Sequence, residues 1–264
     1  MDVFEALVLG VIQGLAEWLP ISSSGHLVIA QELLGLASGE NLLFDLFLHL
    51  GTMLAVIVFF RKELWKIVLA MLTPKTRRGP QEEALRMLGL MILVAIIPIS
   101  VVGVLLSSAM EDVFTITFVG VALIVNAAIL VAAERRGMSG TRKSAKFVDA
   151  LTVGVFQAVA ILPGISRSGA TISGGLFRGL ERETAATFSF LVSVPTLVGA
   201  FSYGIVTLEK YDTDWLMVVI GTATAFVMGL VSIEYLLKAV RSGRLWVFAA
   251  YCAVLGSLVL VLTL

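Results

Sequence analysis

Two polar stretches interrupt an otherwise apolar chain, and their residue types could do chemistry. The first is QGLAEWLPISSSGH at residues 13–26, and the second is PGISRSGAT at 163–171. In the first, Gln13 and Glu17 are four residues apart and share a face of a helix that ends near Trp18. Their oxygens suit a hard divalent cation, Mg²⁺ or Ca²⁺. We predict a cation site with Gln13 and Glu17 as ligands; the alternative is that they only bond the serines and backbone of the break.

The segment SSSGH brings three hydroxyl groups and an imidazole directly after this helix. A serine among residues 22–24 within reach of His26 is the minimal arrangement for an activated nucleophile. A second helix would begin here, and the free N–H groups at a helix N-terminus attract phosphate. The alternative is that the serines only cap this helix and that His26 is a hydrogen-bonded structural residue.

The second stretch contains Arg167, the only basic residue between Lys146 and Arg178. A guanidinium binds phosphate oxygens with two parallel hydrogen bonds. The alternative is an ion pair between Arg167 and Glu17, into which a ligand could still be inserted. Further donors in this stretch are Ser166, Ser168 and Thr171. Together, the two stretches favour a site for a phosphate ester or pyrophosphate with an apolar tail, hydrolysed through nucleophilic attack and electrostatic stabilisation of the phosphoryl oxygens.

Composition indicates an all-α polytopic membrane protein. Of 264 residues, 58% are hydrophobic and 14% charged, against about 25% charged in soluble domains. The net charge of zero gives no sign of a nucleic-acid partner, and the single cysteine, Cys252, excludes an intramolecular disulfide. Six segments are long enough to cross a bilayer: 42–60, 84–106, 114–133, 186–206, 215–237 and 245–263.

Four apolar segments are shorter, at 3–19, 25–36, 149–162 and 169–180. We predict that they form two re-entrant helix pairs, each broken by Pro, Gly and Ser; the alternative is one long kinked span through each pair. Basic residues concentrate in loops 61–83, 134–148 and 238–244, which predicts that these loops are cytoplasmic. The loop with Glu111 and Asp112, the 207–214 loop and both termini are then outside. The expected location is the plasma membrane.

An internal repeat is expected to position the two stretches together. A shift of 144 residues aligns GVIQGLAEWLPISSSGHL at 10–27 with GVFQAVAILPGISRSGAT at 154–171. The same shift pairs Phe44 with Phe188 and Thr52 with Thr196. The repeat halves are about 1–140 and 141–264, within one integral membrane domain over 1–264. Each half has three spans, so the second copy enters from the opposite face; this is an inverted-topology repeat with its broken helices near the midplane. The matched pairs are Gly10/Gly154, Val11/Val155, Gln13/Gln157, Ala16/Ala160, Ile21/Ile165, Ser22/Ser166, Ser24/Ser168 and Gly25/Gly169.

These stretches resemble the two signature motifs of the undecaprenyl pyrophosphate phosphatase (bacitracin-resistance) family. QGLAEWLPISSSGHL is similar to its [E/Q]-x-x-x-E motif with a trailing Ser-Ser-x-Gly-His, and PGISRSGATISGG to its P-G-x-S-R-S-x-x-T motif. The similarity continues through FDLFLHLGTMLAV and FSFLVSVPTLVGA. The resemblance implies a metal-dependent membrane phosphatase that removes the terminal phosphate of a C55 polyprenyl pyrophosphate, leaving the monophosphate lipid carrier, at a site open to the outer face.

Carried over by motif, Glu17, His26 and Arg167 are the main catalytic positions and Ser23 is the nucleophile, with His26 as base or leaving-group acid. Whether serine or histidine attacks stays open. Gln13 stands at the first motif position, where the family has Glu or Gln, and this weakens the case that two carboxylates hold the metal. The residues expected to bind the phosphates are Ser22, Ser24, Ser166, Ser168 and Thr171.

Two other functions remain as alternatives. Inverted repeats with midplane sites are usual in secondary transporters, so a polyprenyl-phosphate flippase is the main one and a non-catalytic membrane scaffold the weaker one. Asp45 and His49 share a face of the 42–60 span; we interpret them as a satisfied polar pair, with a supporting role at the site as the alternative. Gly-rich helices such as SGGLFRG permit close packing, and a homodimer is possible.

Overall fold

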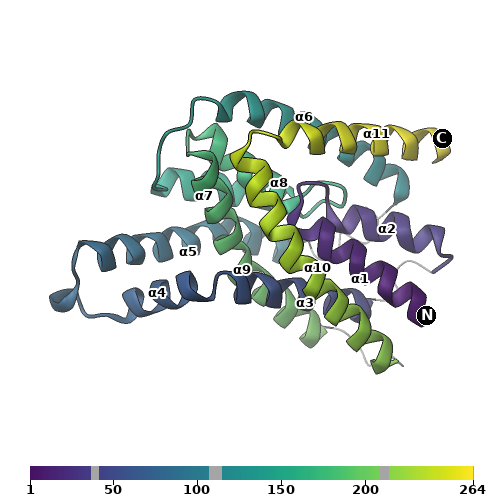
Figure 1. Cartoon of the computed structure of the whole chain (residues 1–264), viewed down its shortest axis with the longest axis horizontal. Helices are drawn as coiled ribbons and strands as arrows, with labels where there is room; N and C mark the ends of the chain where they lie inside the picture. The colour runs from purple at the N-terminus through teal and green to yellow at the C-terminus, as the bar shows by residue number, and fades with distance from the viewer. Residues whose placement is uncertain (37–41, 107–114, 208–213, 264) are drawn as a thin grey trace.

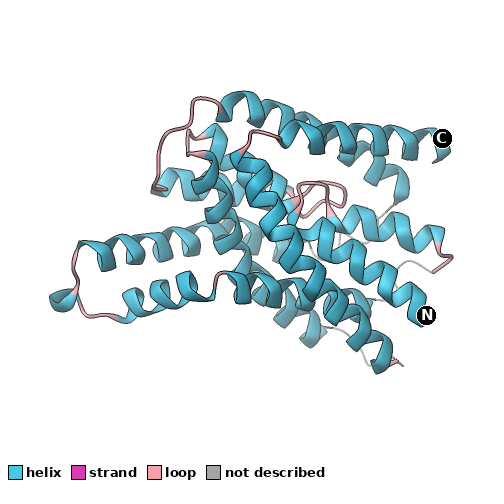
Figure 2. Cartoon of the chain, in the orientation of Figure 1, coloured by secondary structure: helices cyan, strands magenta, loops and turns pink. Residues whose placement is uncertain are grey.

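The described part of the chain is all-helical. The structure is a computed structural model that describes residues 1–36, 42–106, 115–207 and 214–263. Within these ranges the chain forms helices and loops and no strand (Figure 2). The predicted outer loops, with Glu111 and Asp112 and most of 207–214, lie outside the described residues.

Among the described residues, six helices are long and apolar enough to cross a membrane, as the sequence predicted. Their side chains suit an apolar environment, and the helical form bonds the backbone within each segment, as a membrane interior requires. Several are longer than the predicted spans because polar residues extend the helix beyond the apolar stretch. They are α3 (Leu42–Phe59), α5 (Pro80–Leu106), α6 (Ile116–Gly137), α9 (Arg182–Thr207), α10 (Trp215–Arg241) and α11 (Leu245–Thr263).

Four short helices correspond to the predicted short apolar segments. They are α1 (Val3–Trp18), α2 (Ser23–Leu33), α7 (Phe147–Val159) and α8 (Arg167–Phe177). The basic segment 61–83, predicted as a loop, instead contains α4 (Arg61–Leu72) and the short 3₁₀ helix η1 (Lys75–Arg77). Its charges are spaced among apolar residues, so α4 packs an apolar side on α5, and the two form a hairpin that extends from the bundle (Figure 1).

The packing places α1 and α7 in similar settings. Helix α1 packs against α10, whereas α7 packs against α5, and α6 runs along α11 (Figure 1). Small residues permit these close approaches. A Cβ atom on Gly10 would lie 2.8 Å from the Gly221 carbonyl oxygen, and one on Gly154 would lie 2.5 Å from the Ala95 carbonyl oxygen. Both breaks are thereby held deep in the helix bundle.

Candidate active site

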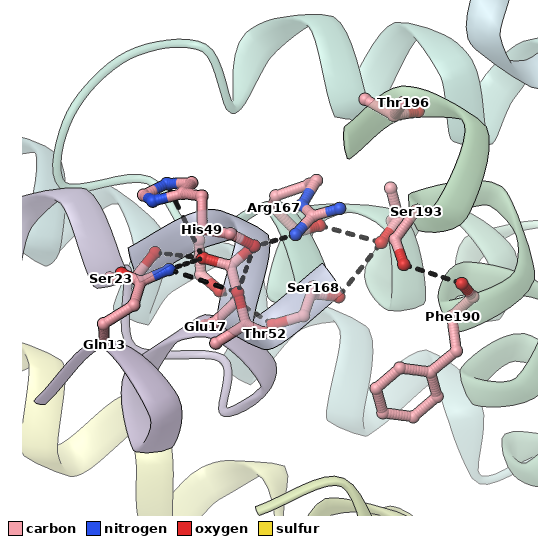
Figure 3. Close-up of polar contacts among 12 residues, drawn as sticks. Gln13, Glu17, Ser23, His49, Thr52, Arg167, Ser168, Phe190, Ser193 and Thr196 are labelled. Carbon is pink, nitrogen blue, oxygen red and sulfur yellow. Dashed lines mark hydrogen bonds and ion pairs between the residues drawn. The ribbon is translucent and has the colours of Figure 1, made fainter. Parts of the chain in front are cut away.

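Glu17 is the centre of a buried polar cluster (Figure 3). Its side chain is 4% exposed. The Ser23 hydroxyl donates to its Oε2 atom at 2.6 Å, and the Gln13 amide donates to the same atom at 3.1 Å. Arg167 Nη2 donates to the other oxygen, Oε1. His49 Nε2 lies 3.9 Å from Oε2, so residues from α1, α2, α3 and α8 meet at one carboxylate.

The first break explains how Ser23 reaches Glu17. Helix α1 ends at Trp18, and α2 starts at Ser23, with the Ser22 hydroxyl accepting from the Gly25 N–H at 3.3 Å as the N-cap. Ser22 has a φ of 71°, in the left-handed region that side chains rarely adopt. This conformation turns the chain sharply after Pro20. The first residue of α2 therefore faces the last turn of α1.

The second break places Arg167 as the first residue of α8. Ser166 caps this helix by accepting from the Gly169 N–H at 3.1 Å. The guanidinium lies over the Trp18 ring, 5.5 Å from its centroid, an arrangement that attracts a cation to an aromatic face. Its Nη1 atom is buried and has no hydrogen-bond partner among the described residues. Arg167 thus keeps a donor free for an anionic ligand.

The two breaks are joined by hydrogen bonds. The Gly164 N–H donates to the Ser22 hydroxyl at 3.1 Å, and the Ser168 hydroxyl donates to the Leu19 carbonyl at 3.2 Å. Asn126, which the sequence analysis missed, donates to the Pro20 carbonyl at 2.9 Å. Its signal was present in the sequence as a single amide inside an apolar span, which is costly unless it is bonded.

The structure does not bring every predicted site residue to Glu17. His26 Nδ1 donates to the Ser22 carbonyl at 2.8 Å, and its Nε2 lies 2.7 Å from the Tyr251 hydroxyl. The imidazole stacks on the Tyr251 ring, with the centroids 5.6 Å apart. His26 therefore lies on the side of α2 that faces α11, and its ring bonds the Ser22 carbonyl and Tyr251 rather than Glu17.

His49 occupies the position that we expected for His26. Its Nδ1 atom donates to the main-chain carbonyl of Asp45 at 3.1 Å, which leaves Nε2 facing Glu17. The Asp45 carboxylate instead accepts from Gln31 at 2.9 Å on both oxygens. The side chains of Asp45 and His49 therefore do not pair with each other, contrary to the interpretation from sequence. The Asp45 carboxylate bonds Gln31 of α2, and the His49 ring belongs to the cluster around Glu17. The His49 position is set by tertiary packing of α3 on α1.

The remaining predicted hydroxyls divide into two groups. Thr171 Oγ1 donates to the Arg167 carbonyl at 2.8 Å and lies 2.5 Å from the Ser189 hydroxyl, so it joins α8 to α9. It lies with Ser168 in the tightly packed region next to Arg167 and Trp18. Of the predicted serines, Ser22, Ser23, Ser24 and Ser166 line the main cavity together with Glu17.

A cavity of about 640 Å³ opens from this cluster, and its two ends differ in chemistry. One end contains Glu17, the serines, His49 and Arg167. The other end runs between α5 and α9 and is mainly apolar, lined by residues including Ile96, Ile99, Val104, Leu197, Ala200 and Tyr203. An amphiphile with a phosphate head and a hydrocarbon tail matches this distribution.

The donor set fits a hard cation only in part. Gln13 Oε1 is buried without a hydrogen-bond partner among the described residues, next to the carboxylate of Glu17. Amide and carboxylate oxygens are ligands that Mg²⁺ and Ca²⁺ accept. Among the described residues, however, no group of three or more His, Cys, Asp and Glu side chains could hold a metal ion. A cation at Gln13 and Glu17 would therefore need oxygens from a substrate or from water.

Two side-chain contacts near the first break recur near the second break. Gln13 donates to Thr52 at 3.4 Å, and Gln157 donates to Thr196 at 3.2 Å. The two glutamines are 144 residues apart, and so are the two threonines. The Ser22–Ser24 hydroxyl contact of 3.3 Å corresponds to a Ser166–Ser168 contact of 3.0 Å. The aligned positions therefore agree in structure as well as in residue type.

The described part of the chain defines a class: a helical multi-pass membrane protein in which a carboxylate, an arginine and several serines line one amphiphilic cavity. The sequence model of the family described as bacitracin resistance protein BacA matches residues 6–258, and the chain belongs to that family. It is 37% identical to a protein of Methanosphaera stadtmanae named undecaprenyl-diphosphatase, over 100% of this chain and 99% of that one. Proteins with the same name from Korarchaeum cryptofilum (39% identical, 98% of this chain and 99% of the relative) and Desulfosudis oleivorans (40%, 98% of each) are similarly related.

Proposed function

We propose that the protein hydrolyses the terminal phosphate of a polyprenyl (undecaprenyl) pyrophosphate and leaves the monophosphate lipid carrier. The observation that carries this proposal is the contact of Ser23 and Arg167 with the same Glu17 carboxylate at the polar end of an amphiphilic cavity. Relatives that align over nearly the whole chain carry the name undecaprenyl-diphosphatase. The pyrophosphate would lie among these side chains and the polyprenyl tail between α5 and α9.

Ser23 is the proposed nucleophile. Its hydroxyl already donates to Glu17 at 2.6 Å, so the carboxylate is placed to accept the proton as Ser23 Oγ forms a bond to the terminal phosphorus. The bond from that phosphorus to the bridging oxygen breaks, and the lipid monophosphate leaves. Water then hydrolyses the phosphoserine, which releases inorganic phosphate and restores Ser23. Arg167 and the N–H groups at the start of α8 would stabilise the phosphoryl oxygens.

The predicted role of His26 changes under this proposal. Its Nδ1 hydrogen bond to the Ser22 carbonyl holds the sharp turn before Ser23, and its other nitrogen is directed to Tyr251. His26 therefore orients the nucleophile through the backbone, and proton transfer falls to Glu17.

Gln13 and Glu17 would hold the divalent cation, Mg²⁺ or Ca²⁺, with the remaining ligands from the pyrophosphate oxygens and water. The cation would neutralise charge on the phosphates as the bridging bond breaks. The buried, unpartnered Gln13 Oε1 supports this assignment. Chelation should abolish phosphate release, and addition of Mg²⁺ or Ca²⁺ should restore it.

We also propose that α1–α2 and α7–α8 are re-entrant pairs of an inverted repeat, with the site near the midplane, open to the outer face, and both termini outside. The equivalent Gln–Thr and Ser–Ser contacts support the repeat. So does the exchange of partners, in which α1 packs on α10 and α7 on α5. Accessibility labelling of single cysteines in a Cys252→Ala background, at the termini and in the 138–146 loop, tests the orientation.

The decisive experiment measures phosphate release from undecaprenyl pyrophosphate by the purified protein in detergent. The expected result is turnover by the wild type and loss of turnover in Glu17→Ala and Arg167→Ala. A wild type that binds the lipid without releasing phosphate contradicts the proposal. Lipid flux across proteoliposomes in that case favours the flippase.

A further inference from the structure

Asn126 lies in α6, at the contact between the two breaks. Its side chain is fully buried. The amide nitrogen donates to the Pro20 carbonyl at 2.9 Å, and the amide oxygen accepts from the Ser166 N–H at 3.1 Å. One side chain therefore bridges the first break to the second.

These contacts settle the orientation of the amide. The Pro20 carbonyl can only accept and the Ser166 N–H can only donate, so the Asn126 nitrogen must face the first and its oxygen the second. The nitrogen also lies 3.4 Å from Cys252 Sγ in α11. Both backbone groups lie in the breaks between helices, where no helical hydrogen bond satisfies them, and leaving either one unpaired in an apolar interior is unfavourable. The bridge is thus specific in geometry and strongly favoured.

The bridged groups are close in sequence to the reacting residues. Pro20 lies three positions before Ser23 and three after Glu17, and Ser166 directly precedes Arg167. The other bonds between the breaks come from residues of the breaks themselves, such as Gly164 to Ser22. Asn126 comes from a separate helix and does not line the cavity, so it can be replaced without removing a phosphate-binding group.

We propose that Asn126 is a positioning residue that sets the separation between the serine nucleophile and the arginine phosphate clamp. This inference rests on the proposed function. When the bridge is absent, the break that carries Ser23 and the helix that begins at Arg167 can shift apart. Because misplacement of about 1 Å can slow a reaction by about 10²-fold, the loss should fall on kcat more than on KM.

The test compares Asn126→Ala with Thr222→Val, a control that removes a hydrogen bond between helices away from the breaks. Thr222 Oγ1 donates to the Phe47 carbonyl at 3.2 Å and joins α10 to α3. Asn126→Ala should lower kcat about 10–100-fold with KM within about twofold, whereas Thr222→Val should keep the wild-type kcat. An equal loss of kcat in both variants, or a rise in KM alone, overturns the proposal.

Asn126→Asp is the conservative variant. A carboxyl group buried in apolar surroundings is held protonated, so it can donate to the Pro20 carbonyl and accept from the Ser166 N–H as the amide does. Its kcat should be closer to that of the wild type than the kcat of Asn126→Ala. If Asp is no better than Ala at this position, the bridge is not the cause of the effect.

An activity-independent measurement separates this inference from the proposed function. Hydrogen–deuterium exchange in peptides that cover 19–25 and 163–171 should rise in Asn126→Ala and stay unchanged in Thr222→Val. Unchanged exchange in Asn126→Ala contradicts the bridge even if the wild type is inactive. Absence of turnover in the wild type, with the expected change in exchange, refutes the enzymatic proposal and leaves the bridge intact.

Discussion

Ser23 and Arg167 occupy equivalent positions 144 residues apart, and each is the first residue of its helix, α2 and α8. Both side chains contact Glu17, the serine at Oε2 and the arginine at Oε1. The two positions aligned by the shift of 144 residues therefore carry different side chains, a hydroxyl at Ser23 and a guanidinium at Arg167. Glu17 has no counterpart in the second copy, where the aligned residue is Ile161.

Replacing Arg167 should nearly abolish phosphate release. Arg167→Ala removes the guanidinium that would stabilise the phosphoryl oxygens and leaves Glu17 buried without its cationic partner. We expect kcat to fall about 10²–10³-fold or more, measured with undecaprenyl pyrophosphate in detergent. The control is Lys238→Ala, which breaks only the exposed Lys238–Glu234 ion pair of α10. Activity near the wild-type level in Arg167→Ala contradicts the assigned site.

Ser23→Ala should eliminate turnover while the protein still folds. The substitution removes one hydroxyl that contacts Glu17 and leaves the N-cap of α2, Ser22, in place. The measurement is phosphate release combined with a search for covalently bound phosphate on the wild-type protein after acid quenching. Ser202→Ala is the control because Ser202 is exposed and bonds only within α9. Residual turnover in Ser23→Ala comparable to the wild type excludes Ser23 as nucleophile.

Replacing His26 should lower kcat more than replacing Tyr251. His26→Ala removes the imidazole hydrogen bond to the Ser22 carbonyl and leaves only the backbone bond from the residue-26 N–H, whereas Tyr251→Phe removes the partner of the imidazole Nε2 atom. We expect His26→Ala to lower kcat by about tenfold or more through displacement of Ser23, and Tyr251→Phe to have a smaller effect. The two variants are compared by steady-state kinetics. Equal losses would mean that the histidine–tyrosine pair acts as a unit.

Gly51→Ala should destabilise the fold through steric crowding alone, because it adds one methyl group and no polar atom. A Cβ atom at this position would lie 2.4 Å from the Thr222 carbonyl oxygen, where α3 approaches α10. The backbone must shift to accommodate it, at a cost of about 1–3 kcal/mol in the free energy of unfolding. Thermal unfolding in detergent measures the change. Gly199→Ala is the matched control because no atom lies within 4 Å of its added Cβ; an equal shift in both variants contradicts the packing argument.

Asp149 should make stability depend on acid pH. It lies in the first turn of α7, outside the six spanning helices. Burial raises the pKa of its carboxyl group. Hydrogen bonds from Arg142, the Lys146 N–H and Arg178 outweigh this effect and lower the pKa to about 2. Since the unfolded value is about 3.9, this stabilisation is complete above about pH 4 and is lost as the pH falls through about 2.

Asp149→Asn should therefore lower the melting temperature at pH 7, and its difference from the wild type should shrink as the pH falls below about 4. Thermal unfolding in detergent across this range is the measurement. Glu234→Gln serves as the control because its ion pair with Lys238 is exposed. A difference between wild type and Asp149→Asn that is the same at pH 7 and pH 3 contradicts the assignment.

The sequence alone determined the membrane class, the six spans, and the two breaks with Glu17, Ser23 and Arg167. It could do so because helix length, apolar composition and turn-forming residues are local properties, and because a charge in an apolar segment stands out. The offset of 144 residues paired Gln13 with Gln157 and Thr52 with Thr196, and in the structure Gln13 donates to Thr52 and Gln157 donates to Thr196. Helix α4 was missed because its amphipathic pattern is short and rich in charge.

Only the tertiary structure decided which side chains share the site. The sequence favoured His26 over His49 as the site histidine, but the rotation of α2 directs His26 to Tyr251 while the packing of α3 directs His49 to Glu17. Asn126 is far from both breaks in sequence and joins them through space. These outcomes depend on how helices rotate and pack against one another, and that is set by contacts between distant segments rather than by any local pattern.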